Sequence, residues 1–174
     1  MKQVPNPPGG TLHDYVPFYF APRSPMLSAI HNGNVRGCNL AQEDIVHFET
    51  TVDRVIANNN EVVFYERNAT KPYSTPHIDL SLLATEVAWD LITESPRLDG
   101  YCKFFFDRPD VDKYVERSER RHAEFLAKQQ VKLDCMTRAG VCNEEKANEV
   151  RTILAGFGVN LDVEVMTDWY FLGQ

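Results

Sequence analysis

The chain has 174 residues, 43% of them hydrophobic and 11% aromatic, so it can bury a core and is not globally disordered. No apolar run reaches the ~20 residues of a membrane helix, which excludes a transmembrane protein. The first residues lack the apolar centre of a secretory signal, so we expect a cytoplasmic protein. The net charge of −7 argues against a general nucleic-acid coat but does not exclude a local basic groove.

The negative charge is concentrated in the middle of the chain. Residues 41–99 hold four basic and eleven acidic side chains, whereas residues 1–40 hold three basic and one acidic. Arg117, Arg120 and Arg121 form a basic cluster further on. On charge alone, a solvated helix face is the favoured interpretation of this cluster, although either flank could meet an anion.

The first half of the chain alternates between apolar segments and turns. Residues 1–10, rich in Pro and Gly, predict an N-terminal arm that precedes a single domain at 11–174. Pro17 indicates an edge or a bend in the first extended segment, and Ser24 is a helix cap. The pattern predicts, in order, an extended segment at 12–20, a short helix from Pro25, a strand at 44–49, helical turns at 51–57 and a strand at 61–66.

The second half alternates in the same way. The pattern predicts, in order, a loop at 68–76, a helix at 80–93, an apolar run at 101–106, a charged helical stretch at 110–121, a helix after Asn143 ending at Gly156 or Gly158, and strands at 161–166 and 169–172. Together the elements indicate one α+β or α/β domain with a mixed sheet.

Cysteine spacing gives no sign of a metal site. The four cysteines, Cys38, Cys102, Cys135 and Cys142, contain no CxxC pair, and the histidines are scattered along the chain. We therefore expect reduced thiols and no metal ligands.

The segment HDYVPFYFAPRSPML, residues 13–27, presents Arg23 at a turn just before a helix N-terminus. Pro22 and Pro25 stiffen the backbone around it. A fixed guanidinium beside free helix N–H groups suits a phosphate or an anion that develops in a reaction. The competing interpretation is an ion pair with an internal acid such as Asp14.

The segment RRHAEFL, residues 120–126, allows two interpretations. Helix propensity continues the charged helix and makes Glu124 one more surface acid. The alternative is a strand whose start holds Glu124 beside two arginines.

These two segments, as GGTLHDYVPFYFAPRSPML and RRHAEFL, resemble the DarT-type DNA ADP-ribosyltransferase toxins. DIVHFE, the Asn68-Ala69 pair and VEVMTDWYF add weaker support, and the blocks follow the family's order over nearly the whole chain. The resemblance implies an α+β ADP-ribosyltransferase fold, with a split mixed β-sheet, flanking helices and a cleft for NAD. It also implies a strand at 121–127, against propensity.

The resemblance further implies transfer of ADP-ribose from NAD to a base in single-stranded DNA, with release of nicotinamide. One branch of the family modifies thymine at a ring nitrogen, and another modifies guanine; we expect thymine. The family usually forms a toxin–antitoxin system with a macrodomain antitoxin that reverses the modification. By motif match, Glu124 is the catalytic glutamate, Arg23 is the catalytic arginine, and Asp107 to Ser118 is the substrate-facing loop.

The reaction itself calls for these residue types. Departure of nicotinamide builds positive charge on the ribose, which a carboxylate such as Glu124 stabilises. Arg23 can hold the pyrophosphate or the charge that develops on the base. We expect Tyr19 and His13 to contact NAD as well. The candidates for gripping or stacking on DNA are Tyr15, Tyr114, Arg117, Arg120, Arg121 and His77.

One family feature has no counterpart here. Members usually begin with a further strand and a His-rich NAD-binding motif, whereas ten residues precede Thr11 in this sequence. This leaves an alternative hypothesis: a catalytically impaired relative that binds single-stranded DNA or a partner protein. A third hypothesis is a transferase that acts on RNA or protein.

Overall fold

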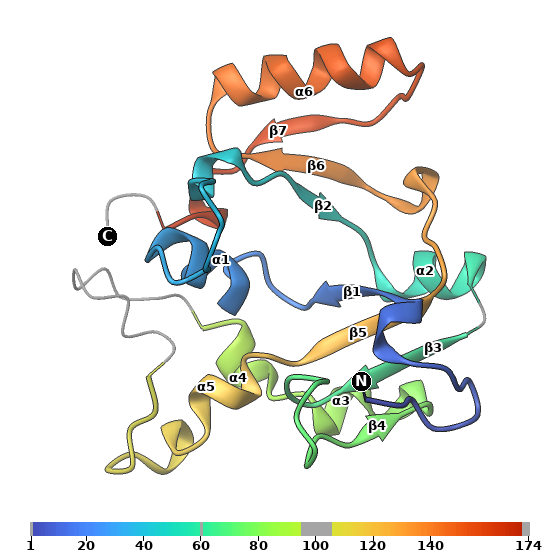
Figure 1. Ribbon diagram of the computed structural model, residues 1–174, viewed down its shortest axis with the longest axis vertical. Helices are drawn as coiled ribbons and strands as arrows, with labels where there is room; N and C mark the ends of the chain where they lie inside the picture. The colour runs from blue at the N-terminus through green and yellow to red at the C-terminus, as the bar shows by residue number, and fades with distance from the viewer. Residues whose placement is uncertain (1, 60, 95–105, 172–174) are drawn as a thin grey trace.

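Two separate β-sheets organise the chain, and helices flank both of them (Figure 1). The computed structural model describes residues 2–59, 61–94 and 106–171. The four-stranded sheet has the order β1-β5-β3-β4, and all of its pairs are antiparallel. Its strands are β1 (Tyr15–Tyr19), β5 (Glu124–Lys128), β3 (Val62–Tyr65) and β4 (Pro76–His77).

The three-stranded sheet has the order β2-β6-β7, with β2 antiparallel and β7 parallel to the central strand β6. Its strands are β2 (His47–Glu49), β6 (Arg138–Val141) and β7 (Val163–Val165). The α-helices are α1 (Pro25–His31), α2 (Val52–Asn58), α3 (Leu83–Glu86), α4 (Trp89–Ile92), α5 (Arg117–Arg120) and α6 (Glu144–Gly156).

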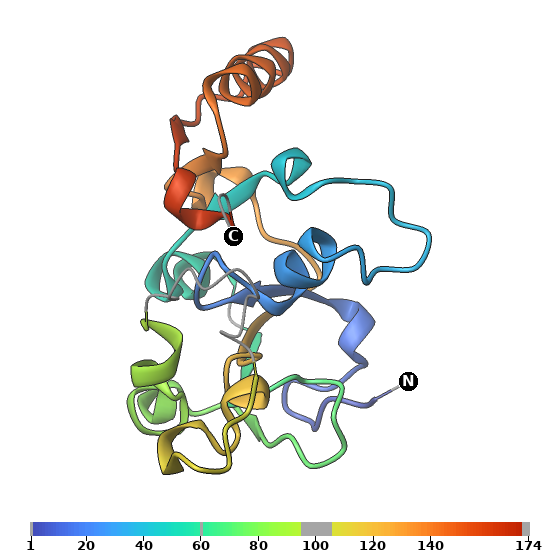
Figure 2. The same cartoon turned by 90° about the vertical axis from the view of Figure 1, so that its left-hand side faces the viewer.

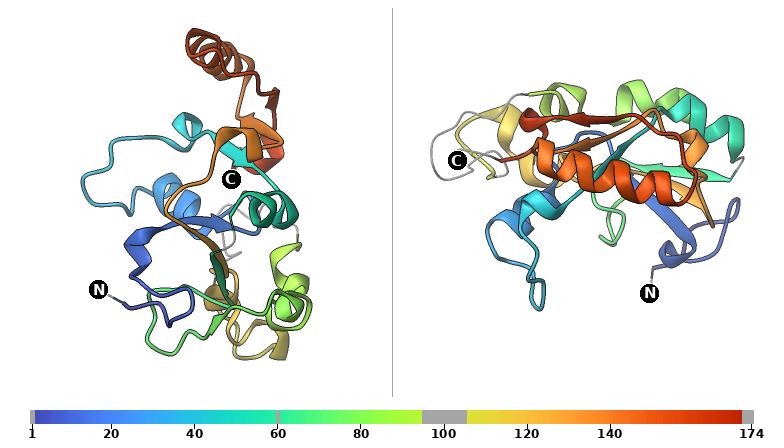
Figure 3. Two further views of the ribbon diagram at one scale, coloured as in Figure 1. Left: turned by 90° about the vertical axis from the view of Figure 1, so that its right-hand side faces the viewer. Right: turned by 90° about the horizontal axis from the view of Figure 1, so that it is seen from above.

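The two sheets have different helical neighbours. The long helix α6 lies at one end of the molecule, beyond β7, whereas α3, α4 and α5 lie at the opposite end (Figure 2). Seen from above, α6 runs along the three-stranded sheet (Figure 3). Ala147 and Leu154 of α6 pack there against Ala139 and Val141. Within the described residues, no helix is long and apolar enough to cross a membrane.

Local sequence signals explain several elements. Ser24 caps α1 by accepting a hydrogen bond from the Leu27 amide, and Asn143 caps α6 in the same way through the Lys146 amide. Pro17 lies in β1, which is an edge strand of its sheet, where a missing N–H is tolerated. The predicted helix at 51–57 and the strands at 61–66 and 161–166 are confirmed within two residues.

The strand that begins at Glu124 overrides helix propensity because both of its faces are covered. Phe125 and Ala127 join the core beneath α2 and α4, while Leu126 packs on the other face with Val4 and Tyr15. The strand prediction for 121–127 is therefore confirmed, with a start three residues later. The predicted N-terminal arm packs onto this second face through Val4.

Two helix predictions need correction, and the strand predicted at 44–49 shortens to 47–49 after a 3-10 turn, Gln42–Asp44. The helix predicted at 80–93 breaks at Val87, which is buried and extended; the next residues turn so that the Trp89 indole N–H donates to the Leu83 carbonyl at 2.8 Å. The helix predicted at 110–121 shortens to α5 after a single 3-10 turn at 112–114. The Asp107 carboxylate accepts the Ser118 amide and closes a loop there instead.

The strand predicted at 169–172 is wrong over its described residues. A 3-10 turn, Thr167–Trp169, precedes Tyr170, and the Phe171 amide donates to the Gln42 side chain at 2.7 Å rather than to a neighbouring strand. The apolar run at 101–106 lies outside the described residues except for Phe106.

Candidate active site

Glu124 occupies the first position of β5, the strand between β1 and β3. It lies opposite Tyr19 on one side and Tyr65 on the other. Only 8% of its surface is exposed. Glu124 forms no ion pair with the described residues, and a carboxylate this buried without one is typical of a functional group.

The surroundings of Glu124 favour its neutral form more than water does. Burial raises the pKa of the Glu124 carboxyl to about 7. A hydrogen bond from the Ala69 backbone and the charge of Lys2 lower this pKa, and so limit the rise. Burial also raises the pKa of Tyr19 and of Tyr65 to about 12, which keeps both phenols neutral near Glu124.

Arg23 lies in the turn between β1 and α1 and is held by the C-terminal segment. Its Nε donates to the Tyr170 carbonyl at 3.1 Å. Tyr170 is itself fixed, because its hydroxyl donates to the Ile45 carbonyl at 2.6 Å and lies 3.2 Å from the Gly140 carbonyl. The backbone of the C-terminal segment thus fixes the direction of the Arg23 side chain, as a preorganised functional site requires.

The alternative role for Arg23 is an ion pair with Asp14, but the main partner of the Asp14 carboxylate is Thr11. The Asp14 carboxylate accepts the amide and the hydroxyl of Thr11, at 2.7 and 3.0 Å, and so caps a 3-10 turn, Leu12–Asp14. That turn precedes β1, whereas Arg23 follows it.

A cavity of about 590 Å³ lies beside the turn that carries Arg23. Pro22 and Ser24, on either side of Arg23, line it, and so does Phe125, the neighbour of Glu124. Neither Arg23 nor Glu124 is among the described lining residues. Successive side chains of a strand point to opposite faces, so Phe125 marks the cavity as lying on the face of β5 opposite to the Glu124 side chain. The cavity therefore adjoins the Arg23 turn, and Glu124 lies on the other side of the sheet.

The loop from Asp107 to Ser118 is closed at its base by the contact between those two residues, at 2.8 Å. Tyr114 donates to the Glu94 carboxylate at 2.5 Å, and Arg117 contacts the same carboxylate at 3.3 Å. The Arg117 guanidinium also lies over the Tyr114 ring, 4.5 Å from its centre. The loop thus carries an ordered stack of a cation and an aromatic ring.

Three candidates for DNA contact are otherwise engaged. Tyr15 is buried, and its hydroxyl donates to the Gly9 carbonyl at 2.6 Å. Arg121 is buried and donates to the Leu91 carbonyl. His77 stacks on the Phe64 ring at 4.8 Å. The burial of Tyr15 and Arg121 removes them from the surface that DNA could touch.

Two further candidates have different positions. Arg120 is exposed and pairs with Glu116 at 3.2 Å. His13 is exposed in the turn before β1, at the opposite end of that strand from Tyr19. A five-residue strand separates its ends by roughly 15 Å, so the fold does not bring His13 to Glu124.

Sequence reasoning missed several residues around the site. Lys2, Arg67 and Tyr170 were not candidates, and Ala69 entered only as part of a family-like pair. Their roles arise from main-chain and long-range contacts, which leave no local pattern. Within the described residues, no three His, Cys, Asp or Glu side chains gather as metal ligands would.

Two sheets, one antiparallel and one mixed, with a buried glutamate at the start of the interior strand β5 and an arginine in the turn after β1, are the features of an ADP-ribosyltransferase-type protein. The family model for DarT, described as a single-stranded DNA thymidine ADP-ribosyltransferase, matches residues 1–171. The chain belongs to the DarT family. The resemblance drawn from the sequence is therefore confirmed.

Individual relatives agree with this assignment. A DNA ADP-ribosyl transferase of Thermus sp. strain 2.9 is 32% identical over 97% of this chain and 74% of its own length. One from Escherichia coli O127:H6 is 30% identical over 97% of this chain and 72% of its own.

Solved structures of the Thermus protein also match. Thermus sp. 2.9 DarT in complex with NAD+ has a TM-score of 0.82, over 97% of this chain and 78% of that one. The same protein in complex with ADP-ribosylated single-stranded DNA has a TM-score of 0.82, over 97% and 74%. The expected fold class is confirmed.

Proposed function

We propose that this chain transfers ADP-ribose from NAD to thymidine in single-stranded DNA, with Glu124 and Arg23 as its catalytic residues. One observation carries the proposal: the buried Glu124, at the first position of β5, lies opposite Tyr19. Arg23 follows Tyr19 by four residues, so the strand pairing brings the arginine turn to the same end of the sheet as the glutamate. The matching Thermus structures contain NAD+ or ADP-ribosylated single-stranded DNA, which supports both substrates. The family description supports thymidine as the acceptor.

Glu124 has the properties that the first half of the reaction needs. When the bond between ribose and nicotinamide breaks, its electron pair leaves with nicotinamide and the ribose becomes cationic. An ionised Glu124 that accepts hydrogen bonds from the ribose hydroxyls stabilises this charge. Burial strengthens the interaction, because little water screens it.

The second half of the reaction forms a bond from a thymine ring nitrogen to the ribose carbon. That nitrogen must lose its proton, and a carboxylate with a pKa near 7, as Glu124 has, can accept it. In this proposal, Arg23 holds either the pyrophosphate or the negative charge that develops on the base. It donates through Nε to Tyr170, so its orientation is fixed before substrate arrives.

The loop from Asp107 to Ser118 is the proposed contact surface for DNA. Tyr114 and Arg117 supply a ring and a cation on it, and the exposed Arg120 follows in α5. Aromatic stacking with phosphate contacts suits a single strand, whose bases need no extraction from a duplex. We also propose a cytoplasmic setting and a macrodomain antitoxin as partner.

Mass spectrometry of modified oligonucleotides tests the substrates. The chain is incubated with NAD and three single-stranded oligonucleotides: one with thymidine, one with guanosine but no thymidine, and an RNA of matched sequence. The proposal expects one added ADP-ribosyl group on the thymidine oligonucleotide alone. Modification of guanosine or RNA would contradict the acceptor. Binding to single-stranded DNA without any product would favour a catalytically impaired relative.

A further inference from the structure

We propose that Arg67 is a positioning residue for Glu124, because it ties the loop 66–75, which presents the Ala69 amide to Glu124, to the helix that leads into β5. The inference rests on the proposed function, in which the Glu124 carboxylate acts on the ribose. Arg67 would touch no substrate and would act through the loop.

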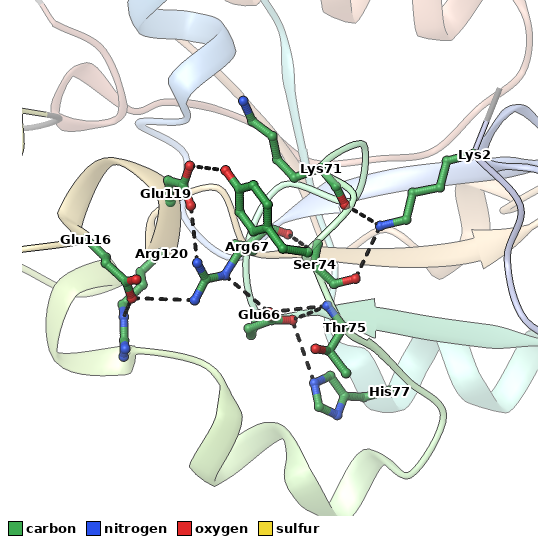
Figure 4. Close-up of polar contacts among 11 residues, drawn as sticks. Lys2, Glu66, Arg67, Lys71, Ser74, Thr75, His77, Glu116, Glu119 and Arg120 are labelled. Carbon is green, nitrogen blue, oxygen red and sulfur yellow. Dashed lines mark hydrogen bonds and ion pairs between the residues drawn. The ribbon is translucent and has the colours of Figure 1, made fainter.

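Arg67 contacts three carboxylates from two elements (Figure 4). Its Nε lies 3.2 Å from Glu66, next to it in the chain. Its terminal nitrogens lie 3.1 Å from Glu119 and 3.5 Å from Glu116. Glu119 is in α5 and Glu116 directly precedes it. One side chain thus joins the loop to α5, which ends four residues before Glu124.

The loop has a second set of bonds that depend on the same residues. Both oxygens of the Glu66 carboxylate accept the Thr75 amide, at 3.2 and 3.0 Å, which joins the two ends of the loop. Tyr73 donates its hydroxyl to Glu119, and its ring lies 5.7 Å from the Arg67 guanidinium. The loop is therefore held from within and from α5.

Lys2, from the N-terminal segment, also binds the loop. Its ammonium group donates to the carbonyls of Lys71 and Ser74, at 2.6 and 3.2 Å (Figure 4). It also lies over the Tyr65 ring, 4.9 Å from its centre. Lys2 holds the loop through its main-chain carbonyls, whereas Arg67 and Tyr73 link the loop to α5 through Glu119.

Ala69 carries the effect to Glu124. Ala69 is buried against Tyr65, which lies opposite Glu124, and Leu126, which lies on the same face of β5 as Glu124. This packing brings the Ala69 backbone to the Glu124 carboxylate, which it hydrogen-bonds. A backbone donor favours the ionised carboxylate only while the loop keeps it in place. Among residues 2–59, 61–94 and 106–171, the other charged or titratable groups that act on Glu124 are Lys2 and the neutral phenols of Tyr19 and Tyr65.

Arginine suits this role better than lysine. Its planar group offers several N–H donors in fixed directions, so it can serve Glu66, Glu116 and Glu119 at once. Lysine has one ammonium group on a flexible stem and would keep only part of the link. Arg67→Lys is therefore expected to behave as a partial rescue.

Titration of the Glu124 carboxyl tests the inference without any need for activity. The protein is labelled with carboxyl-13C glutamate, and the Glu124 signal is identified by its absence in Glu124→Gln. Arg67→Gln should raise the Glu124 midpoint by about one pH unit, and Arg67→Lys by less. Glu119→Gln weakens the link to α5 and leaves Arg67 with Glu66 and Glu116, so it should also raise the midpoint, by less than Arg67→Gln.

Arg138→Gln is the matched control. Arg138 also joins two carboxylates, Glu49 and Glu164, at 2.7 Å each, but it lies in the three-stranded sheet. Its loss should lower stability and leave the Glu124 midpoint unchanged. An unchanged midpoint in folded Arg67→Lys and Glu119→Gln would overturn the inference, whether or not Arg67→Gln folds.

Kinetics then separate the inference from the proposed function. If the wild type transfers ADP-ribose, Arg67→Gln should lose about fivefold in kcat at pH 7 and recover near pH 9, with the KM for NAD little changed. A loss of the same size at both pH values would indicate a merely structural role. A wild type that transfers nothing would refute the proposed function, while the titration would still decide the role of Arg67.

Discussion

Tyr19, the last residue of β1, lies directly opposite Glu124, the first residue of β5. This register brings the Arg23 turn, which follows β1, to the strand end that carries the glutamate. A shift of one residue would turn Glu124 to the other face of the sheet, among Phe125 and its apolar neighbours. The pairing of these two strands is thus what assembles the candidate site.

The transferase rate should rise with pH through about 7. The pKa of the Glu124 carboxyl is about 7 because of burial, and the ribose cation needs its ionised form. Rates with saturating NAD and a thymidine oligonucleotide, measured from about pH 5.5 to 9, give the profile. A rate that is flat across this range would show that Glu124 does not titrate in the step that limits turnover.

Glu124→Gln should stabilise the fold at alkaline pH while it lowers the transfer rate by about 10²–10³. The pKa of about 7 in the folded protein lies above the ordinary glutamate value of 4.5. The protonated form is thus favoured by folding, and that stability is present at low pH and lost as pH rises through about 7. Glutamine avoids the buried charge, so the free energy of unfolding at pH 9 should rise by up to about 3 kcal/mol.

Urea unfolding of both proteins at pH 4 and pH 9 measures this difference. The gain should be present at pH 9 and small at pH 4, where both side chains are neutral in the folded protein. A Glu124→Gln variant less stable than the wild type at pH 9 would contradict the idea that burying the ionised Glu124 carboxylate costs folding free energy.

Tyr170→Phe should lower stability by about 1–3 kcal/mol and reduce activity further than that loss explains. It removes the hydroxyl that contacts Ile45 and Gly140, and so loosens the carbonyl that holds Arg23. Tyr65→Phe is the matched control, because the buried Tyr65 hydroxyl has no hydrogen-bond partner among the described residues. Equal stability losses for both variants would contradict this account.

Arg120→Gln should lose affinity for single-stranded DNA, whereas Arg121→Gln should lose stability. Arg120 is exposed, so its loss should weaken binding to single-stranded DNA and lower the salt slope by about 0.7, with little change in stability. Arg121 is buried and bonded to the Leu91 carbonyl, so its loss should unfold the protein more easily. Fluorescence titrations at several salt concentrations and thermal melts distinguish them; an unchanged salt slope for Arg120→Gln would remove it from the DNA surface.

Local sequence patterns predicted the elements that short-range chemistry decides. The Ser24 cap of α1, the Asn143 cap of α6 and the edge position of Pro17 all follow from residue type. The strand at Glu124 did not follow from propensity. It followed from the family resemblance, and its physical cause is burial on both faces by segments far away in the chain.

The parts that sequence missed depend on long-range contacts. Nothing local distinguishes the exposed Arg120 from the buried Arg121. Arg120 ends α5 and pairs with Glu116, whereas Arg121, the next residue, points inward to the Leu91 carbonyl. The contact of Ala69 with Glu124 and that of Arg23 with Tyr170 use main-chain groups, which every residue type offers. Such contacts become visible only when the fold is known.

The central claim is that the Glu124 carboxylate stabilises the ribose cation, and a single-turnover rate tests it most directly. Transfer from NAD to a thymidine oligonucleotide is measured at pH 8 for the wild type and for folded Glu124→Gln. Loss of one such electrostatic group predicts a rate lower by about 10²–10³, with NAD still bound. A Glu124→Gln rate within about threefold of the wild type would contradict the claim.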